Sequence, residues 1–423
     1  MTDGDIERIF EERKDNPAYN TSYPLRPDDW KRYRVGGEAD FSKDKRLSFY
    51  VHIPFCEHLC AFCEYTRMRI PTEELQTAYL HAIKHDMALF LRNHPHRELL
   101  GFDIGGGTPT ALSIRNFSYL MEIFGWAKQQ LHCTDDFEPS IEATFQTLTE
   151  EKARRMHDAG IERVSLGVQS SQTDLRHIYG RVNVNEAEMI ETLEMLNRVG
   201  IEKVNLDFMY GLRNQSLQDI ERDIALIGRL MPQQVTLYEL RTNMLKSAAA
   251  QSKELLFQSY NLFYNALTGL GYSARFGQNT FSLDKNDKGL SSYLRHRMIE
   301  FAPYKGFGIS AQSLSSTHIS YNEGKLLTDI KTLLTNGTFN AAYTYRLPRK
   351  EMLAKYIAVS GYYGSFSLSK AGSILGKDFQ MAFAPALNFC KSEGLLSIKG
   401  DTIRITPKGF KNYGAVFSLF YHE

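Results

Sequence analysis

The chain has 423 residues, 43% of them hydrophobic, which predicts roughly two to three domains with a sizeable core. Its 50 Lys and Arg residues balance 49 Asp and Glu residues, so the bulk charge argues against a surface for nucleic acid or membrane. A small molecule is therefore the expected partner.

The cysteine pattern and the hydropathy indicate the cellular compartment in which the protein is expected. Three of the five cysteines are clustered at Cys56, Cys60 and Cys63, while Cys133 and Cys390 stand apart, so the set does not resemble a disulfide framework. The first residues lack an apolar signal core, and no apolar run reaches the length of a membrane span. These features predict a reducing, cytoplasmic location.

The chain begins with a polar, charge-mixed stretch and continues with alternating strand and helix patterns. Residues 1–46 are expected to form an N-terminal arm with a short amphipathic helix at 6–13. Strands are expected at 47–53, 99–104, 140–144, 163–168, 203–208 and 234–239, and helices at 74–92, 114–130, 149–159, 186–198, 217–230 and 251–270. The alternation predicts an α/β fold in which parallel strands with crossover helices curl into a partial (β/α)6 barrel.

The loop after the first predicted strand carries the three clustered cysteines. Thiolates this crowded repel one another unless a cation or a metal cluster neutralises them, and sulfur ligands select zinc or iron–sulfur centres. A structural zinc ion would need a fourth ligand, and the nearby candidates are His52, His58 and Glu64. An iron–sulfur cluster would instead keep one iron open. The spacing alone leaves three alternatives open: an iron–sulfur cluster, a zinc site, and thiols that happen to lie close together without a metal.

Polar residues recur where the other predicted strands end. The run Gly105, Gly106, Gly107, Thr108 follows the second strand, where bare backbone amides can approach a ligand. Glu142, Gln169 and Asp207 lie at the ends of the next three strands. Because the carboxyl ends of parallel strands meet at one edge, we expect these groups to lie together around a ligand.

The cysteine motif resembles that of a known superfamily. Cys56-x3-Cys60-x2-Cys63, with Phe62 before the third cysteine, is similar to the motif of the radical S-adenosylmethionine (SAM) enzymes. The preceding Tyr50-Val-His-Ile-Pro-Phe narrows the resemblance to the HemN-like, oxygen-independent coproporphyrinogen III oxidase family. This resemblance implies a [4Fe-4S] cluster on the three cysteines, whose open iron chelates SAM, and a reduced flavodoxin or ferredoxin as the electron donor.

The resemblance also implies which residues contact SAM. It places the run 105–108 along the methionine part of SAM, and it adds Tyr50 and Phe62 beside the cluster. Glu142, Gln169, Arg181 and Asp207 fall where family members hold SAM. Carboxylates suit ribose hydroxyls or a sulfonium, and an arginine suits a carboxylate.

The remaining segments are expected to close the barrel. Residues 47–325 form the barrel with its extension, in which 304–313 and Tyr321 resemble the family's glycine-rich loop for a second SAM or the substrate. Residues 340–423 are expected to form a winged-helix-like domain with a hairpin at 395–409. Without a basic recognition helix, a cover over the barrel is favoured over nucleic-acid binding. Residues 20–25 resemble an arm that leads toward the active site.

Two departures from the family bear on the reaction. Family oxidases continue after the third cysteine with Gly-Cys, whereas this chain has Glu64 and Tyr65. A basic set for several propionates is not obvious, and the candidates are Arg67, Arg69, Arg241 and Lys305.

Three functions follow, in this order of preference. The first is a two-SAM enzyme that transfers a methyl or methylene group to an unsaturated, aromatic or tetrapyrrole substrate. The second is oxidative decarboxylation of coproporphyrinogen III. The third is a haem-binding chaperone on the same barrel.

Overall fold

Six parallel strands form the centre of the main sheet. The computed structural model describes residues 3–15, 27–240, 251–324, 339 and 341–421. The central strands, in spatial order, are β2 (Arg46–Ile53), β5 (Glu98–Gly106), β7 (Ser140–Ala143), β8 (Arg163–Gln169), β9 (Lys203–Tyr210) and β10 (Gln234–Glu239). All six predicted strands are confirmed, and each begins within one residue of its predicted start.

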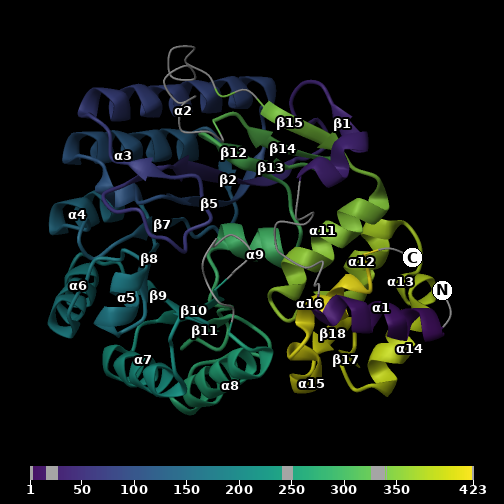
Figure 1. Cartoon of the computed structure of the whole chain (residues 1–423). Helices are drawn as coiled ribbons and strands as arrows, with labels where there is room; N and C mark the ends of the chain where they lie inside the picture. The colour runs from purple at the N-terminus through teal and green to yellow at the C-terminus, as the bar shows by residue number, and fades with distance from the viewer. Residues whose placement is uncertain (1–2, 16–26, 241–250, 325–338, 340, 422–423) are drawn as a thin grey trace.

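Helices cover the outer side of these strands and confirm the predicted alternation. They are α2 (Glu73–Asn93), α3 (Ile114–Gln129), α4 (Glu150–Ala159), α6 (Glu186–Arg198), α7 (Leu217–Leu230) and α8 (Lys253–Gly269), with the short α5 (Thr173–Ile178) after β8. Figure 1 shows α2, α3, α4, α6 and α7 following one another around the sheet. Caps explain several starts: Asn185 and Ser216 form capping boxes at α6 and α7.

The sheet stays open because further strands extend it on both sides. β11 (Thr280–Ser282) pairs with β10 at one end. At the other end β12 (Tyr304–Phe307) lies parallel to β2 and is followed by β13 (Gln312–Leu314), β14 (His318–Asn322), β15 (Ala341–Arg346) and β1 (Arg34–Val35). In the described chain the barrel is therefore partial, as predicted. The short helix α9 (Ser292–Met298) contacts β2 and β5 and occupies the centre of Figure 1.

The two faces of the six strands have opposite character. Strands of a parallel sheet covered on both faces are usually apolar throughout, but here apolar and polar residues alternate. Alternate residues pack outward in the main core: Phe49, Val51, Phe102, Ile104, Ile141, Val164, Leu166, Leu206, Phe208, Val235 and Leu237. The residues between them form an inner face: Ser48, Tyr50, His52, Asp103, Ser140, Glu142, Arg163, Ser165, Gln169, Asn205, Asp207, Gln234, Thr236 and Tyr238. A polar inner face is suited to a ligand.

A smaller unit follows β15. It contains α11 (Arg349–Gly361), α12 (Leu368–Leu375), α13 (Phe379–Ala382), α14 (Ala384–Ser392), α15 (Pro407–Phe410) and α16 (Tyr413–Ser418). Its three-stranded sheet has β18 (Thr402–Ile405) between β16 (Ser365–Ser367) and β17 (Leu396–Lys399). The hairpin expected at 395–409 is confirmed, with Gly400 and Asp401 at its turn. Residues 341–346 belong to the main sheet through β15, and the proposed domain limits remain a prediction.

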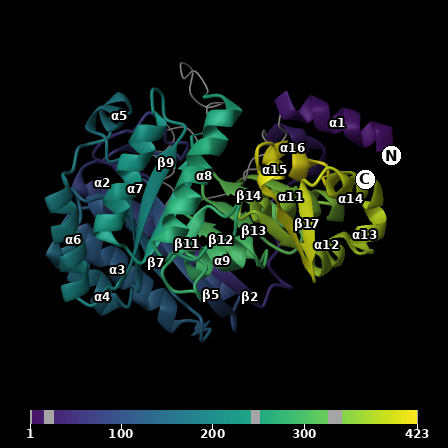
Figure 2. The same ribbon diagram turned by 90° about the horizontal axis from the view of Figure 1, so that it is seen from below.

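The predicted N-terminal helix is confirmed as α1 (Asp3–Asp15) and packs against the small C-terminal unit. It contacts α14 and α16, and Figure 2 shows it beside that unit, away from the parallel strands. Residues 20–25, predicted as an arm toward the active site, lie outside the described residues. Among the helices of the described chain, none combines the length and the apolar character that a membrane span requires.

Candidate functional site

The three cysteines lie in a loop that begins where β2 ends. The loop is tied at its base by pairing of β3 (Phe55–Cys56) with β4 (Met68–Arg69). Cys56 and Cys60 are buried and Cys63 is partly buried, and all five cysteines of the chain are free thiols. The hydroxyl of Thr108 lies 3.7 Å from Cys56 Sγ, and Nη1 of Arg181 lies 3.9 Å from Cys60 Sγ. Hydrogen-bond donors beside the sulfurs of Cys56 and Cys60 stabilise the thiolate form of these residues, which is the form that binds metal.

Burial opposes ionisation of these thiols. It raises the pKa of Cys56 to about 11, and the neighbouring cysteines add to that rise. Burial likewise raises the pKa of Cys63. Since only thiolates bind metal, loading this loop must release protons, and the metal centre must supply the free energy that keeps three thiolates together.

The ligand set fits a cluster better than a single zinc ion. His52 Nε2 lies 2.8 Å from the carbonyl of Thr66 and its Nδ1 lies 3.3 Å from the hydroxyl of Tyr50, so both ring nitrogens have partners. Burial lowers the pKa of His52 to about 4. His58 and Glu64 are exposed. In the described chain, no three His, Cys, Asp or Glu side chains are grouped to hold one metal ion. The cysteine sulfurs of an iron–sulfur cluster bind separate irons, so they lie further apart than the ligands of a single zinc ion. A loop without three closely grouped ligands therefore suits a cluster better.

The glycine run fastens the cysteine loop to the sheet. The amide of Gly107 donates to the carbonyl of Ile53 at 2.7 Å, and that of Thr108 to the carbonyl of Phe55 at 2.8 Å. A Cβ on Gly107 would lie 2.7 Å from the backbone carbon of Pro54, and Gly106 has φ +110°. Larger residues would therefore push the cysteine loop away from β5.

Two partly buried carboxylates lie on the inner face of the sheet, Glu142 on β7 and Asp207 on β9. Glu142 Oε2 accepts the amide of Gly106 at 2.9 Å, and Asp207 accepts from Ser165 Oγ at 3.0 Å and Asn205 Nδ2 at 2.7 Å. Burial raises the pKa of Glu142 to about 7 and that of Asp207 to about 6. Both groups are thus held where a cation or a hydroxyl-bearing ligand would lower their pKa values again.

Gln169 and Arg181 occupy a tight corner at the end of β8. Gln169 has a left-handed φ of 64°, and its buried Oε1 has no hydrogen-bond partner among the described residues. Arg181 Nη2 donates to the carbonyl of Gly167 at 2.6 Å. A Cβ on Gly167 would meet both side chains at 2.6 Å, so only glycine lets them approach. A strained residue with an unused buried acceptor is typical of a ligand site.

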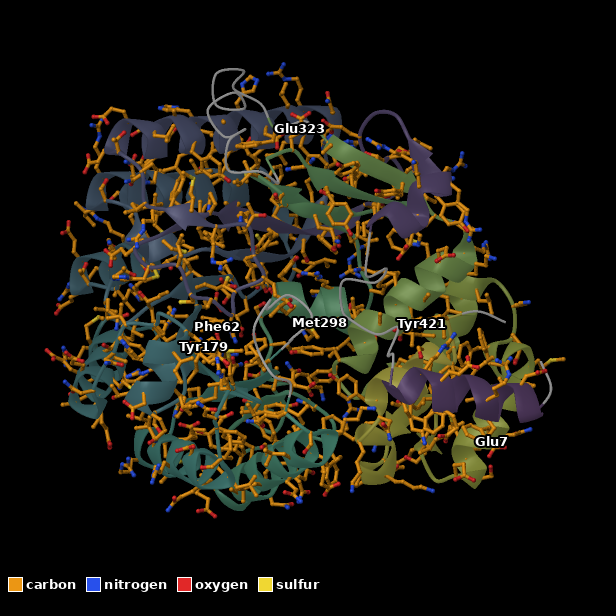
Figure 3. The ribbon with its side chains drawn as sticks, viewed as in Figure 1. Glu7, Phe62, Tyr179, Met298, Glu323 and Tyr421 are labelled. Carbon is orange, nitrogen blue, oxygen red and sulfur yellow. The ribbon has the colours of Figure 1, made fainter. Side chains whose placement is uncertain are left out.

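Phe62 anchors the cysteine loop in a small apolar cluster. Its ring meets that of Tyr179 edge to face at 5.9 Å, and Figure 3 shows the two labelled side chains next to each other. The cluster also contains Leu175, Met209, Leu212 and Leu240. Tyr50, the other aromatic residue predicted beside the cofactor, stacks on Tyr293 at 5.7 Å.

Of the basic residues considered for propionates, the three that the structure describes do not form a common site. Arg67 donates to the carbonyls of Cys63 at 2.6 Å and Cys60 at 2.7 Å, so it braces the cysteine loop. Lys305 lies over the rings of Phe90 and Phe307 on the outer side of the sheet. Arg69 is exposed. Arg241 lies outside the described residues.

The structure adds inner-face residues that the sequence reasoning missed. Arg163 donates to Gln234 Oε1 at 2.6 Å and to Ser140 Oγ at 3.0 Å at the amino end of the strands. Asp103, whose pKa burial raises to about 7, accepts from Ser291 at 2.7 Å. Helix α9 reaches the inner face from the other side, where Tyr293 stacks on Tyr50 and Arg297 donates to the hydroxyl of Tyr293. The alternation of polar and apolar residues along the strands would have indicated Arg163 and Asp103. No local sequence pattern indicated that α9 would bring Tyr293 and Arg297 to the same face.

Comparisons with known proteins agree with this geometry. The chain matches the Radical SAM superfamily over residues 50–227. It is 32% identical to the heme chaperone HemW of Bacillus subtilis, over 46% of this chain and 50% of that protein, so the match spans about half of that relative. It is 28% identical to the heme chaperone HemW of Buchnera aphidicola, over 88% and 98%, respectively. It is 23% identical to the oxygen-independent coproporphyrinogen III oxidase of a Synechocystis species, over 89% and 86%.

The fold has a solved counterpart. The structure of coproporphyrinogen III oxidase (HemN) from Escherichia coli superposes with a TM-score of 0.73, covering 89% of this chain and 90% of that one at 21% identity. The superfamily match and the relatives bear out the resemblance predicted from the cysteine motif. The chain is thus similar to the HemN-like proteins of the radical SAM superfamily, whose model it matches over residues 50–227.

Proposed function

We propose that this protein is a radical SAM enzyme that transfers a methyl or methylene group from a second SAM to a tetrapyrrole. The observation that supports it best is the triad of clustered thiols Cys56, Cys60 and Cys63, placed beside the acid-lined carboxyl edge of the parallel strands. When bound, a [4Fe-4S] cluster supplies the electron that cleaves SAM to the 5′-deoxyadenosyl radical.

The protein's own residues would bind and orient SAM. Glu142 and Asp207 offer carboxylates for the ribose hydroxyls or the sulfonium, and the unused Oε1 of Gln169 accepts a further hydrogen bond. Arg181 holds the cysteine loop near β8 through its contacts with Cys60 and Gly167. Burial of these groups keeps water away from the reacting atoms, which protects a radical from quenching.

The proposal also includes an electron donor, a cellular compartment, a second ligand site and a role for the C-terminal unit. A reduced flavodoxin or ferredoxin delivers the electron, and a reducing cytoplasm preserves the free thiols and an oxygen-labile cluster. The loop with Tyr304, Gln312 and Tyr321 lies on β12 to β14, beside β2, where it would hold a second SAM or the substrate. The C-terminal unit serves as a cover, without a role in nucleic-acid binding.

Two other functions have support from the relatives. Oxidation of coproporphyrinogen III is favoured by relatives of that name and by the shared fold. Glu64 and Tyr65 depart from the Gly-Cys expected after the third cysteine in those oxidases. Haem delivery is favoured by relatives named heme chaperone.

One anaerobic experiment separates the three functions. The purified protein is reconstituted with iron and sulfide, reduced, and incubated with SAM and either haem or coproporphyrinogen III. Mass spectrometry of S-adenosylhomocysteine together with 5′-deoxyadenosine supports methyl transfer. Vinyl products from coproporphyrinogen III support the oxidase. Stable haem binding without either SAM product supports the chaperone and contradicts our proposal.

A further inference from the structure

We propose that Arg297, together with the tyrosines around it, binds a carboxylate of the substrate at the mouth of the barrel. This group, which we name the Arg297 cluster, consists of Arg297, Tyr50, Tyr293 and Tyr304. The inference rests on the proposed function and deepens it, because it names the residue that would recognise a carboxylate of the substrate.

Helix α9 brings Arg297 to the inner side of the sheet. The helix crosses β5 at Gly101, where a Cβ would lie 2.3 Å from the backbone nitrogen of Tyr293. Ser291, the residue that caps α9, donates to Asp103 on the inner face at 2.7 Å. Figure 3 labels Met298, the last residue of α9, in the middle of the molecule between the parallel strands and the C-terminal unit. The helix is therefore held against the inner face of β2 and β5.

Arg297 lacks a carboxylate partner in the described part of the chain. Its guanidinium lies 5.8 Å from the ring centre of Tyr293 and 5.0 Å from that of Tyr304, and Nη1 donates to the hydroxyl of Tyr293 at 3.0 Å. Arg295 on the same helix is different, because it pairs with Asp136 at 2.6 Å and with Glu300 at 3.0 Å. One arginine of α9 is neutralised within the chain and the other is not.

A partly buried cation without an anion is costly, and aromatic rings compensate for only part of that cost. A guanidinium carries five N–H donors in a planar fork, which matches a carboxylate with two parallel hydrogen bonds. The donors that Tyr293 and Tyr304 do not use are available for such a ligand. An anion that docks here would gain charge-assisted hydrogen bonds in a site already stripped of much of its water.

The neighbouring rings define the rest of the ligand. Tyr50 stacks on Tyr293 with an angle of 20° between the rings, and Tyr293 meets Tyr304 edge to face. Such faces suit a planar aromatic body. Burial raises the pKa of Tyr50. The negative charge of Glu142 raises this pKa further and the positive charge of Arg297 lowers it, so Tyr50 lies close enough to both residues to be affected by their charges. The cluster is thus next to the proposed SAM site, where a reacting substrate must be.

The test measures binding and does not depend on turnover. Fluorescence titration follows coproporphyrin III, which has four carboxylates, and its tetramethyl ester, which has none that can ionise. The proteins are the reconstituted wild type, Arg297→Gln, Arg297→Lys and the matched control Arg295→Gln on the same helix. SAM binding is measured in parallel by equilibrium dialysis with radiolabelled SAM.

We expect Arg297→Gln to bind coproporphyrin III at least tenfold more weakly, since removing a charge-assisted hydrogen bond has about that effect. Arg297→Lys should lose less, because it keeps the charge without the fork, and it also serves if the glutamine variant fails to fold. Arg295→Gln and binding of the ester should be unchanged.

Three results would overturn the inference. Equal affinity of wild type and Arg297→Gln for coproporphyrin III would remove Arg297 from the substrate site while leaving the proposed function in place. Loss of bound SAM without loss of porphyrin affinity would assign the carboxylate to SAM. A wild type that cleaves SAM but binds no porphyrin would reject the tetrapyrrole substrate, and with it this inference.

Discussion

The two sides of the barrel mouth differ in charge and in how that charge is satisfied. On the side of β7 to β9, Glu142 and Asp207 are acids with amide and hydroxyl donors from the protein, and burial raises the pKa of each. On the side of α9 and β12, Arg297 is surrounded by tyrosine rings. The side with Glu142 and Asp207 therefore suits a ligand with a cation and hydroxyls, such as SAM. The side with Arg297 suits an acidic planar ligand.

Loss of a cluster cysteine should give the largest effect, because it removes the feature on which the acidic side depends. We expect Cys60→Ala to abolish the iron–sulfur absorbance and reductive SAM cleavage while the protein stays folded. Absorbance after anaerobic reconstitution and the yield of 5′-deoxyadenosine are the measurements. Cys390→Ala, a buried cysteine of the C-terminal unit, is the control. SAM cleavage at the wild-type rate in Cys60→Ala would refute the cluster assignment.

A methyl group at Gly101 should disrupt the basic side next most strongly. The added Cβ would overlap the backbone of Tyr293, so α9 must move and carry the Arg297 cluster with it. We expect a loss of about 3 kcal/mol of folding free energy, which is the range of overpacked cores. Urea unfolding of the protein provides the measurement.

Gly125→Ala is the matched control for Gly101→Ala. Gly125 lies within α3 and has open space around the position of a Cβ, so alanine should stabilise the protein by about 0.5–1 kcal/mol. If both variants were equally stable, α9 would not be held against β5 as the structure indicates.

The raised pKa of Glu142 predicts a smaller, pH-dependent effect. In the folded protein Glu142 holds its proton up to about pH 7, whereas the same carboxyl in the unfolded chain ionises near its ordinary pKa of 4.5. Between these values the folded state binds more protons, so its stability falls as pH rises. Without SAM, Glu142→Gln should be more stable than wild type at pH 8 by about 2 kcal/mol and equal to it near pH 4.5.

Thermal melting of the SAM-free protein at the two pH values tests this prediction. Glu122→Gln on the exposed side of α3 is the control and should change neither melting temperature by much. A stability difference that is the same at both pH values would mean that Glu142 titrates normally.

Asp207 should show the smallest effect of the four. Asp207→Ala removes one hydrogen-bonding carboxylate from the proposed SAM site, which we expect to weaken SAM binding about tenfold while the iron content is unchanged. Equilibrium dialysis with SAM is the measurement, and Asp284→Ala in an exposed loop is the control. Unchanged SAM affinity would remove Asp207 from the site and leave Glu142 as the main acid on that side.

Local patterns in the sequence were sufficient for much of this protein. The alternation of strands and helices from 47 to 270 predicted the partial barrel, because each strand and helix is encoded by its own hydrophobic period and caps. The spacing of Cys56, Cys60 and Cys63 indicated the proposed metal centre, since all three lie within one loop. The polar ends of consecutive strands indicated Glu142, Gln169 and Asp207 for the same reason: parallel strands place their carboxyl ends side by side.

Only the tertiary structure decided the other side of the mouth. Arg297 is separated by more than 200 residues from the cysteine loop, and its place depends on how α9 packs across Gly101 and how β12 pairs with β2. Lys305, one residue from Tyr304, points to the outer face because side chains alternate along a strand. Sequence spacing determines contacts within one element or between neighbouring ones, whereas contacts across the barrel depend on sheet register and helix packing, which no local pattern encodes.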